Sequence, residues 1–236
     1  MLKLLEGLRV VTLALNLPGP AACARLRGWG ASVVKVEPPA GDPLEGYCAG
    51  WYRRLHEGID VRRIDLKGDA GKRDFDALLG LADLLVTAQR PAALKRLFLS
   101  AEDLESRHPA LCHVAIVGHA PPHDELAGHD LTYMASLGLV EPGTMPPTLF
   151  ADMAGAERAV STALALLLSR TRTGRGGSRL VSLAEAAEAL AAPRREGLTA
   201  SGGLLGGGLP TYGLYATRAG WIAVAALEPH FAERLG

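Results

Sequence analysis

Short apolar runs alternate with amphipathic stretches along the first half of the chain. Leu8–Leu15 is a β-branched apolar run that ends at a turn with two prolines and one glycine, so it predicts a buried strand. Ala21–Trp29 predicts a helix that Gly30 ends, and Ser32–Glu37 predicts a second strand. A strand, a turn, a helix and a strand within so short a stretch are typical of a parallel sheet.

The same alternation continues up to residue 117. Further strands are expected at Val61–Leu66, Leu84–Thr87 and Leu111–Val117, and helices at Asp74–Leu81, Ala92–Leu97 and Ala101–Arg107. The segment between the second and third strands has several charges and glycines and is expected to be a loop. The predicted fold class is therefore α/β, with an open, doubly wound, Rossmann-like parallel sheet.

The second half begins with the longest helical pattern in the chain, predicted over Met153–Arg172. Its apolar positions recur every three to four residues, which indicates one buried face. A brief strand is expected at Arg179–Ser182, and an Ala-rich helix at Leu183–Ala192 that ends at Pro193.

The remaining residues predict a second, smaller α+β domain. A hairpin of Tyr212–Ala216 and Trp221–Ala225 is expected, followed by a helix that starts near Glu228. The predicted organisation is a large α/β domain over 1–193, a Gly-rich linker over 194–210 and the start of a small domain over 211–236. A hairpin with one turn of helix is too little to bury a core of its own.

The composition narrows the possible partners and compartment. Apolar residues make up 48% of the 236 residues and charged residues 21%, which indicates a soluble globular protein. Lys plus Arg and Asp plus Glu both number 25, and this balance argues against a nucleic-acid partner. The apolar stretch Ala163–Leu168 is too short to cross a membrane. Cys23, Cys48 and Cys112 lack metal spacing and are expected to be reduced thiols in a cytoplasmic protein.

Several nucleotide and hydrolase motifs are missing from the chain. There is no Walker A motif, no GxGxxG after the first strand and no GxSxG, so neither a nicotinamide nor a flavin cofactor is expected. His119 and His123 are four residues apart but straddle two prolines, so they do not share a helix face, and no metal ligand is predicted.

Two side chains beside predicted helix starts are candidates for proton transfer. Asp152 stands directly before the long helix, and His129 begins a shorter helix upstream. Backbone N–H groups and the helix dipole would hold the carboxylate and keep it ionised, and a nearby histidine would exchange a proton with it. The local pattern is equally explained if Asp152 and His129 serve only as helix caps, and this alternative stays open. Arg90 follows a strand and precedes a helix, the position at which doubly wound sheets bind ligands.

These segments occur in the same order as similar segments of a known enzyme family. They read GLRVVTLA…PGPAA, GASVVKVEPPAGDP, IDLK, ADLLVTAQRPAALKRL, LESRHPALCHVAIVGH, GHDLTYMASLG, ADMAGA…LALLLSRTRTGRG and YGLYATRAGWIAVAALEPHF. Over nearly its whole length the chain resembles the family III CoA-transferases (the carnitine dehydratase and bile-acid-inducible type). The GHD and ALEPHF segments make it most similar to the α-methylacyl-CoA racemase branch.

The resemblance implies an acyl-CoA thioester as substrate, with coenzyme A on the large domain, and a homodimer of interlocked chains. In the racemases, residues matching Asp152, His129 and Glu228 remove and return the proton α to the thioester. In the transferases, the residue matching Asp152 attacks the thioester and forms a mixed anhydride. Lys35, Arg90 and Arg96 are the candidate residues for binding coenzyme A.

The chain also departs from the family pattern. His56, Glu57, Gly58 and Ile59 stand where the family has Asn-Arg-Gly-Lys, and Ala151 replaces a glycine before the catalytic Asp. Three hypotheses therefore remain: a racemase, a CoA-transferase that works through an Asp152 anhydride, and a non-catalytic member that forms a heteromer with a full-length relative.

Overall fold

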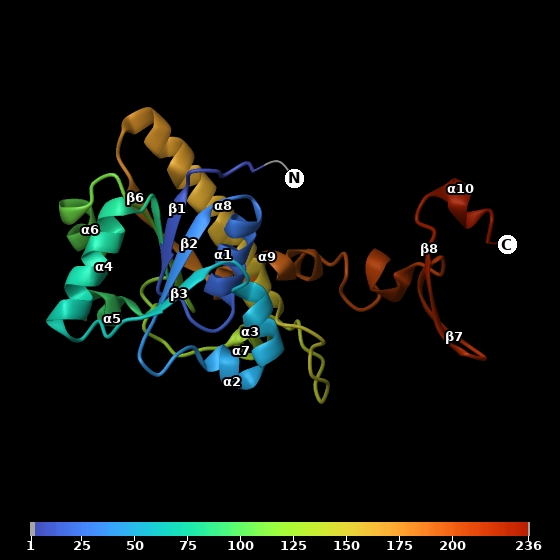
Figure 1. Cartoon of the computed structure of the whole chain (residues 1–236). Coiled ribbons are helices and arrows are strands. Elements are labelled where there is room, and N and C mark those ends of the chain that lie inside the picture. The colour runs from blue at the N-terminus through green and yellow to red at the C-terminus, as the bar shows by residue number, and fades with distance from the viewer. Residues whose placement is uncertain (1–2, 236) are drawn as a thin grey trace. The chain divides into compact units, whose positions relative to one another are not determined.

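A six-stranded parallel sheet lies at the centre of the first of two units (Figure 1). The computed structural model describes residues 3–235, and the chain divides into the units Met1–Ala187 and Glu188–Gly236. The strands are β1 (Arg9–Thr12), β2 (Ser32–Glu37), β3 (Asp60–Arg63), β4 (Leu84–Thr87), β5 (Cys112–Val117) and β6 (Gly177–Ser182), in the spatial order β3-β2-β1-β4-β5-β6. This order is that of a doubly wound dinucleotide-binding sheet, so the predicted fold class is confirmed.

Helices cover both faces of the sheet. They are α1 (Pro18–Gly28), α4 (Asp69–Leu81), α5 (Pro91–Arg96), α6 (Ala101–Arg107), α7 (Asp130–Ser136), α8 (Phe150–Thr173) and α9 (Leu183–Arg195). Val10 faces a core shared with α1 and α8, whereas its neighbour Val11 faces a second core shared with α4, α5 and α6. Successive strand residues point to opposite faces, so a continuous apolar strand serves two cores.

Some element boundaries differ from the predictions. The third strand is only Asp60–Arg63, and it is largely exposed because it lies at the edge of the sheet. The predicted loop after β2 contains two helices, α2 (Pro43–Tyr47) and α3 (Ala49–Leu55). The side chain of Asp42 caps α2, and Pro43 occupies its first position. Both residues are typical of a helix start, but the helix is too short to show a periodic pattern.

Two helices extend further than predicted. Helix α8 begins at Phe150, so Asp152 lies inside its first turn. Helix α9 continues through Pro193 to Arg195, because a proline near a helix end removes only one backbone hydrogen bond.

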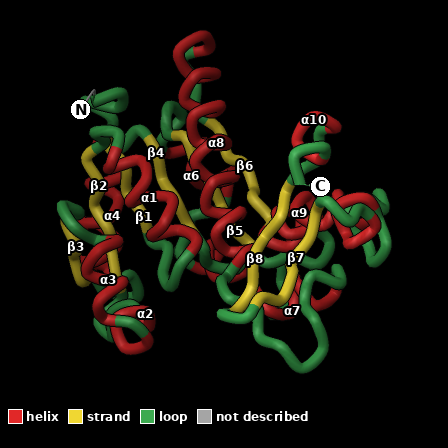
Figure 2. The backbone as a smooth tube through the Cα atoms, turned by 90° about the vertical axis from the view of Figure 1, so that its right-hand side faces the viewer, coloured by secondary structure: helices red, strands yellow, loops and turns green. Residues whose placement is uncertain are grey.

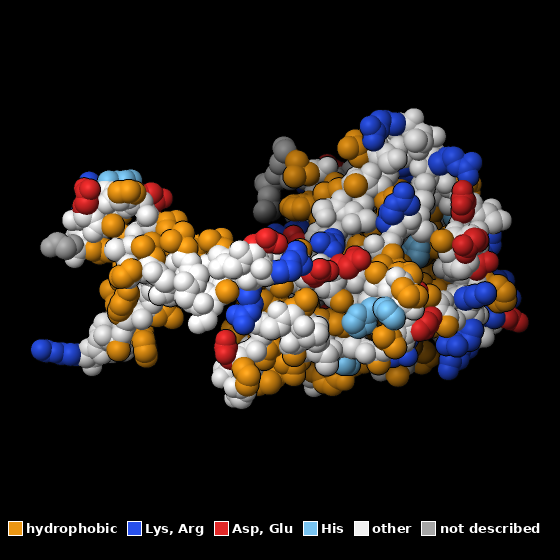
Figure 3. Space-filling view, turned by 180° about the vertical axis from the view of Figure 1, so that it is seen from behind, with side chains coloured by type: hydrophobic (Ala, Val, Ile, Leu, Met, Phe, Trp, Pro, Cys, Tyr) orange, Lys and Arg blue, Asp and Glu red, His pale blue; other side chains and the backbone are white. Residues whose placement is uncertain are grey.

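The second unit contains the predicted hairpin (Figure 2). Strands β7 (Tyr212–Thr217) and β8 (Gly220–Ala225) pair antiparallel, and α10 (Pro229–Ala232) follows. A short π-type turn, Leu204–Gly208, precedes β7. Hydrophobic side chains lie on the surface of this unit (Figure 3).

Candidate functional site

A cavity of about 630 Å³ lies at the carboxyl ends of the central strands of the first unit. Strand β1 pairs with β2 on one side and with β4 on the other, so the chain connections diverge here and leave a crevice. The lining includes Asn16, Leu17 and Pro18 after β1, Gln89 and Arg90 after β4, Val117 and Gly118 at the end of β5, and His129, Asp130, Tyr133 and Asp152. The cavity thus contains both proton-transfer candidates, Asp152 and His129.

The carboxyl group of Asp152 is partly buried, and this changes its acidity. Burial, and to a smaller extent the negative charge of Asp130, raise the pKa of Asp152 from 3.8 to about 6, while His129 acts in the opposite direction. Desolvation thus outweighs the helix dipole in setting the pKa of Asp152, although a carboxyl with this pKa is still mostly ionised at neutral pH. Asp152 exchanges a proton in the range in which a general base is effective.

His129 occupies the N-cap position of α7, as the local pattern predicted. Its backbone N–H donates to Thr132 Oγ1 at 3.1 Å, and its carbonyl oxygen accepts from the Thr132 N–H at 2.8 Å. These backbone contacts fix where the residue stands, and its exposed imidazole lines the cavity. Asp152 is not a cap, since Leu149 is the N-cap residue of α8.

Asp130 belongs to the site although the sequence reasoning did not single it out. It is 3% exposed, and its Oδ1 accepts from the Asp152 backbone N–H at 3.0 Å. Its Oδ2 is buried and has no hydrogen-bond partner among residues 3–235. The available signal was its place in Gly128-His129-Asp130, where it is the one charged residue of a short helix. Asp130 therefore positions Asp152 and also repels its negative charge.

Tyr133 closes one side of the same cavity. Its side chain packs against Gly118 and Gly128: a Cβ at Gly118 would lie 2.3 Å from the Tyr133 hydroxyl oxygen, and one at Gly128 would lie 2.5 Å from the ring. The ring of His119 meets it edge to face, with 5.1 Å between centroids. Glycine is thus needed at both positions, because a larger residue would displace the Tyr133 side chain.

The three basic candidates for coenzyme A binding lie in different environments. Arg90 is exposed, occupies the N-cap position of α5 and lines the cavity. Arg96 is exposed at the last position of α5, away from the cavity lining. Lys35 is 1% exposed. Its prediction as a residue that binds coenzyme A needs correction, because its ammonium group is buried and hydrogen-bonded to Asp42 and His56 and cannot reach a ligand.

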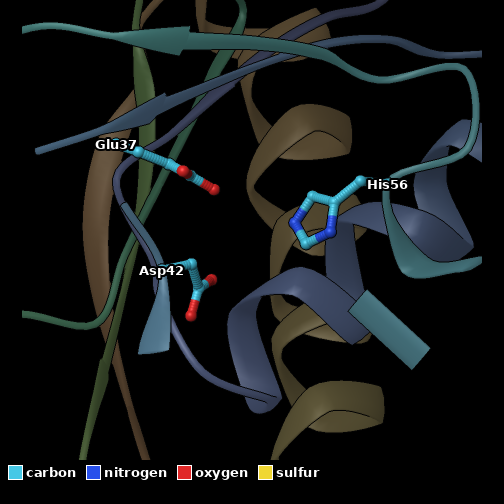
Figure 4. A group of neighbouring side chains, drawn as sticks. All are labelled: Glu37, Asp42 and His56. Carbon is cyan, nitrogen blue, oxygen red and sulfur yellow. The ribbon is translucent and has the colours of Figure 1, made fainter. Parts of the chain in front are cut away.

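Lys35 instead lies among potential metal ligands that the sequence reasoning did not connect. Glu37, Asp42 and His56 bring ligand atoms within 4.8 Å of one another (Figure 4). Lys35 Nζ is hydrogen-bonded to Asp42 Oδ2 and lies 3.1 Å from Glu37 Oε1 and 2.7 Å from His56 Nε2. The ammonium group already supplies a positive charge to these ligands.

The third predicted catalytic residue, Glu228, lies in the second unit. It is exposed and occupies the N-cap position of α10. Its pairing with His129 stays a prediction.

Two further features concern the cysteine thiols and the presence of membrane-spanning helices. Cys23 and Cys112 are buried core residues and Cys48 is exposed; burial raises the pKa of Cys23 to about 12. None of the helices within residues 3–235 combines the length and apolar character that crossing a bilayer requires.

Comparisons with known proteins agree with the fold and the motifs. Human α-methylacyl-CoA racemase is 30% identical over 255 residues, which cover 98% of this chain and 63% of the human protein. Cinnamoyl-CoA:phenyllactate CoA-transferase from Clostridium sporogenes is 32% identical over 207 residues, 78% of this chain and 50% of that protein. The chain thus spans about half to two-thirds of the length of these curated relatives.

The fold is similar to that of a solved relative. The crystal structure of the hypothetical protein Rv3272 from Mycobacterium tuberculosis superposes with a TM-score of 0.86 at 27% identity and covers 100% of this chain and 69% of that one. The sequence profile of CoA-transferase family III matches residues 5–236. On this match, over nearly its whole length, the chain belongs to CoA-transferase family III.

Proposed function

We propose that this protein racemises a 2-methylacyl-CoA thioester by moving the α-proton between Asp152 and His129. The observation that carries the proposal is that both side chains line one cavity at the switch point of the sheet, where burial has raised the pKa of Asp152 to about 6. Human α-methylacyl-CoA racemase is among the relatives of the chain.

The chemistry suits these two side chains. A proton α to a thioester is weakly acidic, so the base must be close and of suitable strength. A carboxylate whose pKa is about 6 is a stronger base than an ordinary one, and an imidazole exchanges protons near neutral pH. One side chain removes the proton from one face of the α-carbon, and the other returns a proton to the opposite face. The stereocentre is inverted while the thioester remains intact.

The surrounding residues receive roles in the same proposal. Burial and the charge of Asp130 keep the pKa of Asp152 high, and Glu228 takes the third catalytic role that the resemblance implies. Arg90 and Arg96 hold the phosphate groups of coenzyme A, since guanidinium groups pair well with phosphate. The protein acts in the cytoplasm as a homodimer or as a heteromer with a full-length relative.

A CoA-transferase reaction is the second candidate. Here the Asp152 carboxylate attacks the thioester carbonyl, the CoA thiolate leaves and an acyl-aspartyl anhydride forms. The raised pKa supports this reaction too, because a more basic carboxylate is a better nucleophile. Cinnamoyl-CoA:phenyllactate CoA-transferase is also among the relatives.

The third candidate is a non-catalytic subunit. The acidic Glu57, which stands in place of a family arginine, supports this candidate.

Deuterium exchange separates these candidates. Incubation of a 2-methylacyl-CoA with the protein in heavy water should exchange the α-proton, and Asp152→Ala should lower the rate at least ~100-fold. Glu157→Gln is the matched control: it lies on the same helix, pairs with Arg25 on the surface and is absent from the cavity lining. It should retain the wild-type rate.

Other outcomes identify the other candidates. Hydroxylamine trapping that labels Asp152 during turnover, without α-proton exchange, would assign the transferase reaction. Neither exchange nor labelling, together with no heat of CoA binding by calorimetry, would assign the non-catalytic role.

A further inference from the structure

The buried cluster around Lys35 contacts the wall of the candidate site. Lys35 is 1% exposed and Glu37 and Asp42 are 0% and 4% exposed, so the cluster is sealed from solvent. An ammonium group has three protons; here Asp42 Oδ2 and His56 Nε2 accept hydrogen bonds from it, and Glu37 Oε1 forms an ion pair with it at 3.1 Å. A buried cation held by two hydrogen bonds and an ion pair is restricted in orientation.

The role of His56 in the cluster follows from its second nitrogen. Nδ1 lies 2.7 Å from the Tyr52 carbonyl oxygen, which only accepts, so Nδ1 carries the proton and Nε2 accepts from Lys35. Burial lowers the pKa of His56 and keeps the ring neutral. A protonated His56 would repel the ammonium group of Lys35, so the neutral imidazole is the form that fits this cluster.

Asp42 connects this cluster to the cavity. Its Oδ2 accepts from Lys35, whereas its Oδ1 accepts from the backbone N–H groups of Asn16 at 3.0 Å and Leu44 at 2.9 Å. Asn16 and Leu44 line the cavity. One carboxylate thus ties the loop after β1 and the start of α2 to a charge buried in β2.

The Asn16 backbone depends on such a tie. Its φ is +63°, a left-handed conformation that asparagine tolerates better than most residues but that still costs free energy. The turn that carries it separates β1 from α1. Without the acceptor on Asp42, the turn would relax toward other conformations and the cavity wall would lose its shape.

We propose that Lys35 and Asp42 form a positioning pair, which holds the Asn16 turn and the start of α2 in the shape that receives the CoA thioester. Lys35 orients Asp42, and Asp42 orients the wall; neither needs to touch the ligand. The inference rests on the proposed function for its ligand, but the backbone order that it predicts can be measured without any ligand.

Amide hydrogen exchange on the wild-type protein gives the first test. The Asn16 and Leu44 amides should be protected to a degree similar to amides in β1. In Lys35→Met, which keeps the length of the side chain and removes the charge, their exchange should accelerate about tenfold or more, because the tie that suppresses local opening is lost. Unprotected Asn16 and Leu44 amides in the wild-type protein would overturn the inference, whatever the variants do.

Ligand binding gives the second test. Lys35→Met should weaken CoA binding by about tenfold, since the wall must then be ordered on binding. With acyl-CoA, the change should appear as a higher KM rather than a lower kcat. Asp42→Asn, which preserves the shape of the side chain, should act in the same direction and serves if Lys35→Met does not fold.

His113→Asn is the matched control. His113 is equally buried and bonded to Thr87 and Ser178, and none of the three lines the cavity. It should leave CoA affinity and Asn16 exchange within about twofold of the wild-type values, because the two sites share no partners. CoA affinity unchanged in Lys35→Met and Asp42→Asn would overturn the positioning role. A wild-type protein that binds no CoA would instead refute the proposed function, and exchange alone would then test the Lys35–Asp42 tie.

Discussion

Asp152 shows how tertiary contacts reverse an expectation based on local position. A place in the first turn of a helix favours the ionised carboxylate by ~0.3–1 kcal/mol at an exposed site. Burial and the neighbouring Asp130 act against it and raise the pKa to about 6. Desolvation is the larger effect, since it penalises the charge itself. The acid–base character of the site therefore comes from packing around Asp152 more than from the helix.

This reversal predicts how stability depends on pH. The pKa of Asp152 is about 6 in the folded protein and 3.8 ordinarily, so the folded state binds the proton more tightly than the unfolded chain. The stability that this difference contributes is present below pH ~4 and is lost as pH rises to ~6, by at most ~3 kcal/mol. Asp152→Asn removes the ionisation and should be more stable than the wild type by ~1–3 kcal/mol at pH 7.5, but by much less at pH 4.

Urea unfolding of both proteins at these two pH values measures the difference. As a control, Asp130→Asn removes the neighbouring charge while Asp152 is kept. In this variant the loss of stability with rising pH should occur at lower pH. An advantage of Asp152→Asn that is the same at pH 4 and pH 7.5 would contradict the assigned cause.

At the scale of elements, the sequence pattern located the buried strands better than the connecting segments. The strands β1, β4 and β5 are apolar on both faces and were predicted from composition alone. Helices α2 and α3 are at most seven residues long, too short for a periodic pattern to emerge. Helices α5 and α6 are equally short, but their start signals at Pro91 and Ser100 were recognised, whereas the start signal of α2 was not. What defines α2 is its cap, Asp42, whose importance is visible only beside Lys35 and Asn16.

The first turn of α1 supplies a prediction at this scale. A Cβ on Gly19 would lie 2.0 Å from the Cβ of Ala14, which is fully buried. Gly19→Ala should therefore destabilise the protein by ~1–3 kcal/mol, as overpacking does. On the same helix, Gly28 has open space around its Cβ position, and Gly28→Ala should stabilise by ~0.5–1 kcal/mol.

Thermal unfolding of the two variants gives the comparison. Because both substitutions add one methyl group to one helix, any difference between them reports the close approach at Ala14. Equal melting temperatures would show that α1 can shift away from that turn at no cost.

At the scale of the molecule, the second unit exposes an unusual amount of apolar surface. Among its described residues only Ala191 and Ala226 are buried hydrophobics, whereas Leu214 and Trp221 are 72% and 74% exposed. A two-stranded hairpin is marginal by itself, and large exposed apolar patches mark interaction sites. This surface is consistent with the homodimer that the family resemblance implies.

We therefore expect the protein to sediment as a dimer at micromolar concentration. Trp221→Ser should raise the dimer dissociation constant about tenfold or more, because a large buried aromatic side chain contributes strongly to an interface. Leu81→Ser changes a residue of α4 that is 62% exposed and should have little effect. A monomeric wild-type protein in sedimentation velocity would contradict the prediction.

The fold class, the family and most residues of the candidate site could be predicted from the sequence alone. Alternating apolar runs predicted the parallel sheet, because burial on both faces leaves a direct mark on composition. His129 and Asp152 were found through motif order, and Arg90 through its position after a strand. These signals lie in short stretches of the sequence, so they can be recognised without the structure.

The surroundings of those residues depend on the tertiary structure. Burial and the neighbouring Asp130 raise the pKa of Asp152, and Lys35 is enclosed with Asp42 instead of being exposed to coenzyme A. Both results depend on which distant groups share a desolvated space, and the energy of a charge depends on that environment more than on its sequence neighbours. Lys35, predicted from the sequence as a ligand contact, is a buried structural cation for this physical reason.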